Sequence, residues 1–68
     1  MSLYKVIQIV GTSEVSWEDA AKNAIDNASE TLHDFRVGEV TRMDVKVENG
    51  RIFYRTRLDL SFKEVHGI

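Results

Sequence analysis

The segment "VTRMDVKVENGRIFYRTRLDLSFK", residues 40–63, decides the fold of this chain. At its centre stands "NG" at 49–50, and Asn-Gly between alternating residues is the strongest short-range signal for a β-hairpin. Before it Met43, Val45 and Val47 alternate with polar residues, and after it the run 51–63 alternates almost throughout. The segment therefore predicts two long antiparallel strands, each with an apolar face and a polar face.

Two further elements precede this hairpin. Residues 3–10, "LYKVIQIV", are rich in β-branched residues and predict a strand that the chain leaves at Gly11. From residue 17 the period changes, and we expect a helix over 17 to about 34, because apolar residues recur at helical spacing. That stripe consists of Ala21, Ala24, Ile25, Ala28, Leu32 and Phe35. Ser16 suits the N-cap, with Asp19 placed to complete a capping box. The order β-α-β-β predicts a single α+β domain, residues 1–68, with one helix across a three-stranded antiparallel sheet.

The composition argues against several classes of protein. A formal charge of -2 from nine basic and eleven acidic residues does not suit a general nucleic-acid binder. The chain has no cysteine, and its two histidines, His33 and His66, are far apart, so a zinc site is not expected. No apolar run approaches the roughly 18 residues of a membrane span, and the first residues lead straight into a strand. We therefore expect no membrane association and a cytoplasmic location.

The junction "QIVGTSEVSWEDAAKNA", residues 8–24, raises the question of a phosphate-binding turn. It lacks the second glycine and the lysine that such a turn requires, so Thr12, Ser13 and Ser16 are interpreted as turn and cap residues. Trp17 could stack on a planar ligand, but packing is favoured, either over the helix start or at a contact between subunits. Neither histidine offers a nucleophile–base pair, and an enzyme is the least favoured class.

Charged residues dominate the polar side of the hairpin. The arginines of this region are Arg36, Arg42, Arg51, Arg55 and Arg57. Cross-strand ion pairs with the intervening acids, within and between subunits, are the expected arrangement, and an anion site facing a cavity is the alternative. The predicted helix carries a carboxylate-rich surface, and carboxylates from neighbouring copies can converge on a hard cation such as calcium. No diagnostic calcium loop is present, so the sequence assigns no metal ligands.

The lengths of the predicted elements favour self-association. A strand of thirteen residues spans about 40 Å, whereas the expected helix spans about 27 Å. One helix cannot cover the apolar face of such a hairpin, and a monomer would expose more apolar surface than soluble monomers usually do. We therefore expect copies of the chain to complete each other's cores.

The pattern also resembles a known family. "YKVIQIVGTSEVSWEDAAKNAIDNASETL", followed by "EV", a long NG hairpin and "LSFK", resembles the dodecins across nearly the whole chain. The resemblance implies a sheet that wraps around its helix and twelve copies in a hollow homododecamer of cubic (tetrahedral) symmetry. It also implies a binding and storage protein without catalytic activity. The ligand implied is a flavin such as FMN, riboflavin or FAD, stacked between aromatic side chains.

The family's pattern places the flavin-binding positions of this chain. They are Arg36, Val37, Gly38, Glu39, Tyr54 and Arg55. The stacking tryptophan of the family falls at Val37, and the glutamine that binds the flavin ring edge falls at Arg55, so we expect weakened flavin stacking. The chain is similar to a dodecin subgroup that is reported to bind calcium and lacks that tryptophan. Calcium is therefore one alternative ligand, and an assembly scaffold without a ligand is another.

Overall fold

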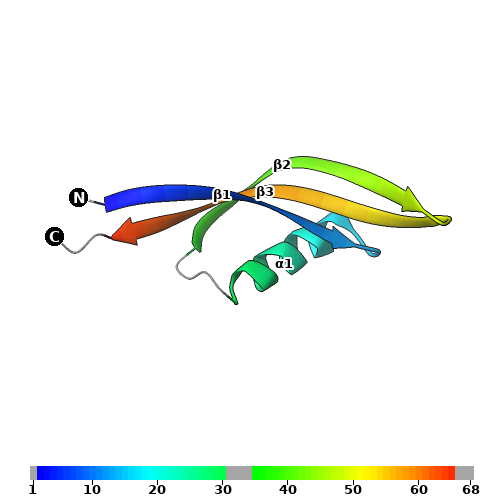
Figure 1. The fold of residues 1–68 in the computed structure, drawn as a ribbon, viewed down its shortest axis with the longest axis horizontal. Coiled ribbons are helices and arrows are strands. Elements are labelled where there is room, and N and C mark those ends of the chain that lie inside the picture. The colour runs from blue at the N-terminus through cyan, green and yellow to red at the C-terminus, as the bar shows by residue number, and fades with distance from the viewer. Residues whose placement is uncertain (1, 31–34, 66–68) are drawn as a thin grey trace.

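One helix packs against one face of a three-stranded antiparallel sheet (Figure 1). The computed structural model describes residues 2–30 and 35–65, with side chains described for 3–30 and 37–62. The elements in chain order are β1 (Ser2–Ser13), α1 (Trp17–Ala28), β2 (Phe35–Glu48) and β3 (Arg51–Val65). The strand order is β1-β3-β2, so β3 is central and runs antiparallel to both neighbours. The predicted β-α-β-β fold is confirmed.

The β2–β3 hairpin turns at the predicted dipeptide. Asn49 and Gly50 have φ angles of 51° and 75°. Positive φ at both central positions is the mark of a type I′ turn, whose twist matches that of the flanking strands. The resulting register pairs Val47 with Ile52 and continues to Met43 opposite Thr56. The predicted alternation along the hairpin is therefore confirmed.

The core lies between α1 and the middle of the sheet. Leu58 and Leu60 of β3 are 2% and 1% exposed and cluster with Ala24 of α1. Ile7 and Ile9 of β1 stand opposite Leu60 and Leu58 and pack against the same cluster. We call this helix-bearing side of the sheet the inner face and the opposite side the outer face.

Gly11 lies inside β1 and not at its end. The strand continues to Ser13, so the prediction that the chain leaves the sheet at Gly11 is wrong. A Cβ on this residue would lie 2.8 Å from the Cβ of Ala24 and closer still to the carbonyl oxygen of Ala20. Gly11 therefore serves to let the backbone of α1 approach the sheet closely.

Side chains hold the turn between β1 and α1. The hydroxyl of Ser16 accepts a hydrogen bond from the Asp19 amide at 2.9 Å, which confirms the predicted N-cap. The Asp19 carboxylate accepts from the Ser13 hydroxyl at 2.6 Å, in place of the predicted return bond to Ser16. The Ser13 oxygen also accepts from the Val15 amide at 2.9 Å. Ser13 and Ser16 are thus turn and cap residues, as predicted.

The helix is shorter than predicted. It ends at Ala28, and Phe35, which the apolar stripe assigned to the helix, is the first residue of β2. Because the step from 32 to 35 also fits helical spacing, the pattern alone gave no sign of the change. Leu32, His33 and His66 lie outside the described residues.

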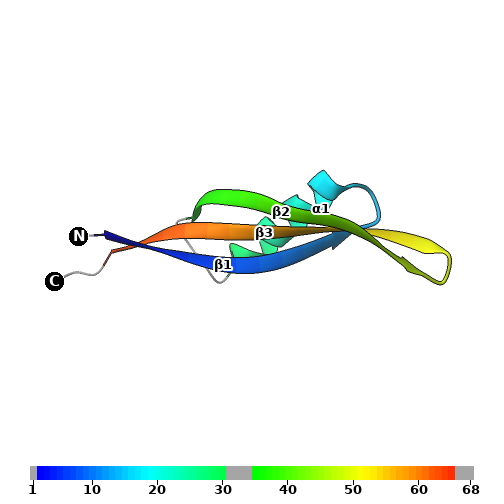
Figure 2. The ribbon, with the colours of Figure 1, turned by 90° about the horizontal axis from the view of Figure 1, so that it is seen from above.

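The subunit is elongated, with extents of 54 × 21 × 15 Å. A helix of 12 residues rises only about 18 Å. The hairpin and the opposite end of the sheet therefore both project past α1 (Figures 1 and 2). On the inner face of the hairpin four apolar side chains stay exposed, which we call the hairpin strip. They are Met43, Val45, Val47 and Ile52, with exposures of 57%, 42%, 69% and 49%.

Candidate functional site

The structure separates the predicted ligand-binding residues into two groups. One group lies near the start of β2 and comprises Val37, Gly38 and Glu39. The other lies on β3 nearer the hairpin turn and comprises Tyr54 and Arg55. The first group stands opposite residues 59–61 of β3, so the two groups are about 13 to 23 Å apart along that strand. One subunit does not bring them together, and the Arg36 side chain lies outside the described part of the chain.

The two groups also divide between the faces of the sheet. A Cβ on Gly38 would lie 3.1 Å from the Cδ2 atom of the buried Leu60, which places Gly38 on the inner face. Because side chains alternate along a strand, Val37 and Glu39 belong to the outer face. Val37 is 60% exposed there and offers no aromatic ring to a planar ligand.

Tyr54 takes part in packing at the start of α1. Its ring meets the Trp17 ring edge-on, with centroids 5.1 Å apart and planes at 77°. Trp17 Nε1 donates to the Asp44 carbonyl oxygen at 3.0 Å, and Thr56 Oγ1 donates to the Trp17 carbonyl oxygen at 2.9 Å. The prediction that Trp17 packs over the helix start is confirmed, and Tyr54 belongs to the same contact.

Arg55 on the outer face forms a two-pronged ion pair with Asp44. Its Nε and Nη2 atoms donate to the two carboxylate oxygens at 2.6 and 2.7 Å. The hydrogen bond from Arg55 is the main reason that the pKa of Asp44 lies below its usual value, and the charges of Arg42 and Arg57 lower it further. The Arg55 guanidinium is therefore already occupied at the position where the family's pattern expects a neutral amide.

The other described arginines of the hairpin do not form ion pairs across its two strands within the subunit. Arg51 donates from Nε to Glu14, in the turn after β1, at 3.0 Å. Arg42 stands directly opposite Arg57 in the β2–β3 register. Among the described residues neither Arg42 nor Arg57 forms a salt bridge or side-chain hydrogen bond. The predicted cross-strand pairing is thus confirmed within the subunit for Arg55, whereas Arg51 pairs with Glu14 outside the hairpin. For Arg42 and Arg57, ion pairs between subunits stay a prediction.

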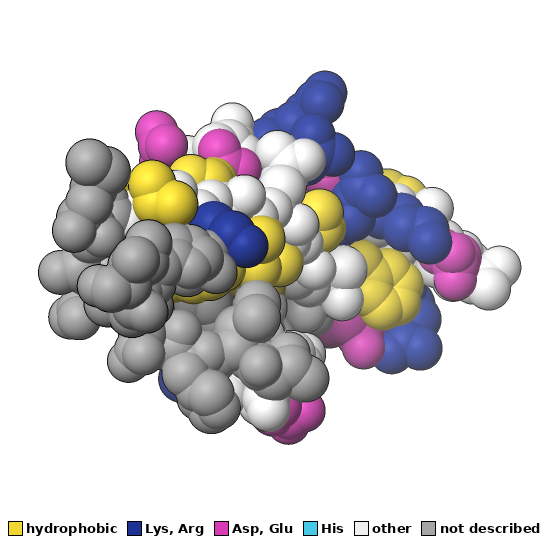
Figure 3. Space-filling model, turned by 60° about the vertical axis from the view of Figure 1, so that its left-hand side comes forward, with side chains coloured by type: hydrophobic (Ala, Val, Ile, Leu, Met, Phe, Trp, Pro, Cys, Tyr) yellow, Lys and Arg dark blue, Asp and Glu magenta, His cyan; other side chains and the backbone are white. Residues whose placement is uncertain are grey.

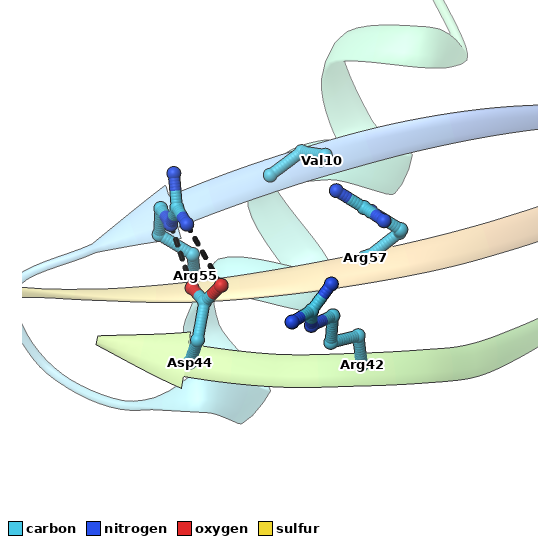
Figure 4. Close-up of a pocket in the computed structure, with 5 residues that line it drawn as sticks. All are labelled: Val10, Arg42, Asp44, Arg55 and Arg57. Atoms are coloured by element: carbon cyan, nitrogen blue, oxygen red, sulfur yellow. Dashed lines mark hydrogen bonds and ion pairs between the residues drawn. The ribbon is translucent and has the colours of Figure 1, made fainter. Parts of the chain in front are cut away.

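A small concavity on the outer face collects these charges (Figure 4). It is lined by Val10, Arg42, Asp44, Arg55 and Arg57, from all three strands. Sequence reasoning named the arginines but missed their grouping. The signal was present, because counting outward from a two-residue turn at 49–50 pairs 42 with 57.

A second hollow, of about 260 Å³, lies on the inner face between α1 and β2. Its walls are mainly apolar, and they include Trp17, Ala21, Val40 and Met43. Met43 also belongs to the hairpin strip, so this hollow continues the exposed apolar surface toward the helix. Its lining suits apolar groups, with Glu18 and Thr56 as its polar members.

Two predicted absences can be checked only within the described residues. Nowhere in that part of the chain do three histidine, cysteine, aspartate or glutamate side chains group closely enough to hold a metal ion. No helix among the same residues is long and apolar enough to cross a membrane.

The comparison of sequences gives a consistent result. The family model for Dodecin matches residues 3–64. Calcium dodecin of Mycobacterium tuberculosis is 48% identical over 64 residues, which cover 93% of this chain and 90% of that protein. The match therefore extends over the helix and all three strands.

Known structures agree with the sequence match. The calcium-chelating calcium dodecin of M. tuberculosis superposes with a TM-score of 0.85 at 43% identity, covering 97% of this chain and 96% of that one. A dodecin from Streptomyces davaonensis gives 0.87 at 30% identity over 96% and 97%. A dodecin from Streptomyces coelicolor gives 0.88 at 31% identity over 97% and 96%.

These matches confirm both the fold and the family predicted from the residues. They also agree with the prediction of a small-ligand-binding protein of the dodecin type. With residues 3–64 matched by the family model and the same fold found in solved relatives, this chain belongs to the dodecin family.

Proposed function

We propose that this chain forms a hollow homododecamer that binds and stores a small ligand without catalysing a reaction, with calcium as the first candidate. The observation that carries the choice of ligand is the 48% identity to a calcium dodecin over 93% of this chain. A cytoplasmic location and the absence of nucleic-acid partners stay predictions.

The exposed apolar surface supports the assembly. The four side chains of the hairpin strip lie beyond the reach of α1, and Val40, at the hollow between α1 and β2, is 47% exposed as well. Burial of apolar surface contributes about 25 cal/mol per Å², so covering this surface favours association of copies. Neighbouring subunits can cover this apolar surface without any other partner.

The distribution of carboxylates bears on where calcium would bind. Calcium takes six to eight oxygen ligands, and the described residues of one subunit group no three acidic side chains. A calcium site with several carboxylate ligands from those residues would therefore combine side chains from more than one copy, with carbonyl and water oxygens as further ligands. The exposed acids on α1 and after it are Glu18, Asp26 and Glu30, of which Asp26 pairs with Lys22 at 2.9 Å.

Flavin is the second candidate, and two observations weigh against tight binding. Val37 provides no ring at the position of the family's stacking tryptophan, and stacking contributes about 0.5–1.5 kcal/mol per aromatic pair. Arg55 is held by Asp44 through both of its hydrogen bonds. The residues of this chain therefore suit a stacked flavin poorly.

Calcium titration of the purified protein tests the first candidate. We expect calcium to raise the thermal midpoint in the millimolar range or below, because a ligand bound only by the folded state stabilises it. Excess chelator should reverse the rise, and magnesium serves as the control for ionic strength. A midpoint that does not move across millimolar calcium would rule out the calcium proposal.

Flavin fluorescence tests the second candidate. Riboflavin or FMN added to the wild-type protein should be quenched only weakly. The double variant Val37→Trp/Arg55→Gln should quench more strongly, since it restores the family's stacking and ring-edge groups. Strong quenching at sub-micromolar wild-type protein would show that these two positions do not control flavin binding.

A further inference from the structure

Two positively charged side chains stand next to each other on the outer face. Arg42 of β2 and Arg57 of β3 are directly opposed in the register. Opposed residues in an antiparallel pair have Cβ atoms about 4.5–5.5 Å apart, and like charges there are destabilising. A negative charge placed between the two arginines would relieve this repulsion.

The Asp44 carboxylate relieves only part of that repulsion, because it is shared with Arg55. Both oxygens of Asp44 accept hydrogen bonds from Arg55, at 2.6 and 2.7 Å. Figure 4 shows this fork, and it shows Arg42 and Arg57 directed into the same space without a bond to any labelled residue. With three guanidinium groups and one carboxylate, the concavity keeps an excess of two positive charges, although the whole chain has a formal charge of -2.

The residues that line the concavity favour the binding of an anion. Val10 stands opposite Arg57 and forms an apolar wall beside it, and Arg57 itself is half-buried. The Arg55–Asp44 pair closes the hairpin side of the concavity. The space-filling view shows basic side chains gathered in a band along the sheet toward the hairpin (Figure 3).

We propose that Arg42 and Arg57 form an anion-binding site on the outer face that takes a dianionic phosphoryl group. A dianion neutralises the excess of two charges, which a single carboxylate does not. Phosphoryl oxygens also match the planar donor fork of arginine, so each guanidinium can donate more than one charge-assisted hydrogen bond. The group is either free phosphate or the head of a small phosphate ester. Arg42 and Arg57 are not among the flavin-binding positions, although Arg55 of that set lines the same concavity.

Titration with inorganic phosphate at low ionic strength tests the proposal, followed by calorimetry and by thermal midpoint. Wild-type protein should bind phosphate and melt at a higher temperature in its presence. Arg42→Gln and Arg57→Gln should each lower the affinity about tenfold or more, because a hydrogen bond to a charged group is lost. In phosphate-free buffer the same variants should melt no lower than wild type, since the repulsion between the two arginines is relieved.

Lys46→Gln is the matched control. It removes one positive charge from the same strand and face, where Lys46 pairs with Glu48 at 3.0 Å. Its phosphate affinity should stay within about twofold of wild type, as expected for an exposed charge outside the site. Equal losses in Lys46→Gln and Arg42→Gln, or no phosphate binding by wild type, would overturn the proposal.

Two further measurements identify the ligand and distinguish this proposal from the calcium proposal. Tighter binding of glycerol phosphate than of inorganic phosphate would assign the site to an ester, and the reverse order would assign it to the free ion. Acetate at the same concentration should compete weakly, because it carries one charge. Calcium titration of Arg42→Gln should match wild type, so failure of the phosphate site leaves the calcium proposal standing.

Discussion

The two halves of the inner face differ in burial although they share one sequence pattern. Under α1, Leu58 and Leu60 are 2% and 1% exposed. On the same strand toward the turn, Ile52 is 49% exposed, and Val47 opposite it is 69% exposed. Both halves alternate apolar and polar residues with the same period. Alternation therefore decides which face a side chain joins, whereas burial depends on what lies over that face.

The helix sets the boundary between these halves. Ala20 and Ala24 are buried against the sheet, and Gly11 lets α1 come close enough to seal that region. The 12 residues of α1 leave the hairpin strip uncovered within one subunit. In our account neighbouring copies cover that strip. Substitutions under α1 should therefore change the stability of the subunit, and substitutions in the hairpin strip should change its assembly.

Leu60→Ala should give the largest effect, because it opens a cavity in the covered half. We expect a loss of about 2–5 kcal/mol in the free energy of unfolding, measured by chemical denaturation. The loss should be nearly independent of protein concentration, since Leu60 is sealed within its own subunit. Val47→Thr is the comparison variant, and it keeps β-branching while replacing a methyl group by a hydroxyl.

The cost of Val47→Thr should grow with protein concentration. In dissociated subunits the change should cost less than about 0.5 kcal/mol, as for other exposed positions. In the assembly it buries a hydroxyl, at about 1–3 kcal/mol. A cost that is the same at every concentration would mean that the hairpin strip is not a contact between copies.

Gly11→Ala comes next and tests the close approach of α1. The new Cβ would meet the backbone of Ala20, which cannot move without shifting the helix, and we expect a loss of about 1–3 kcal/mol. Gly38→Ala is the control, because its Cβ would meet only side-chain ends, the nearest being Leu60 Cδ2 at 3.1 Å. Equal thermal midpoints for the two variants would refute the assigned role of Gly11.

Ser16→Ala should destabilise the packing of α1 on the sheet less than Gly11→Ala does. Loss of the hydrogen bond to the Asp19 amide should cost about 1 kcal/mol and loosen the start of α1. Ser29→Ala, at the other end of the helix, removes an exposed bond to the Ile25 carbonyl oxygen and should cost less. Hydrogen exchange of the amides of residues 17–20 should rise in the first variant alone.

Asp44→Asn on the outer face should have the smallest effect on stability, and this effect should depend on pH. Because the pKa of Asp44 is lowered in the folded state by its hydrogen bond to Arg55, the ion pair stabilises the protein at pH values above the ordinary pKa of an aspartate. The contribution is lost as the pH falls through the lowered pKa. The difference in thermal midpoint between wild type and Asp44→Asn should therefore be largest near neutral pH and should shrink in acid. A difference that grows toward acid would contradict the sign of this shift.

Much of the fold could be predicted because it depends on local chemistry. Asn49 and Gly50 adopt positive φ readily, so they fixed the turn and with it the register of the hairpin. Ser16 was identified as the N-cap because its hydroxyl satisfies an amide of the first helical turn. These features depend on residues close together in the sequence.

The errors concern contacts between distant residues. A glycine within a strand looks like a strand end until the helix that packs over Gly11 is known. Phe35 fits the helical stripe by spacing, yet it pairs with Phe62 in the sheet. The opposition of Arg42 and Arg57 follows from the turn, but Arg51 could not be assigned to Glu14 without the path of the chain after β1.

The molecular mass of the folded protein in solution tests the central claim most directly. Sedimentation equilibrium or native mass spectrometry at micromolar concentration should find an assembly of many copies of the 7.8 kDa chain, with twelve as the expected number. A well-folded species of 7.8 kDa under those conditions would contradict it, because the hairpin strip would then be stable without cover.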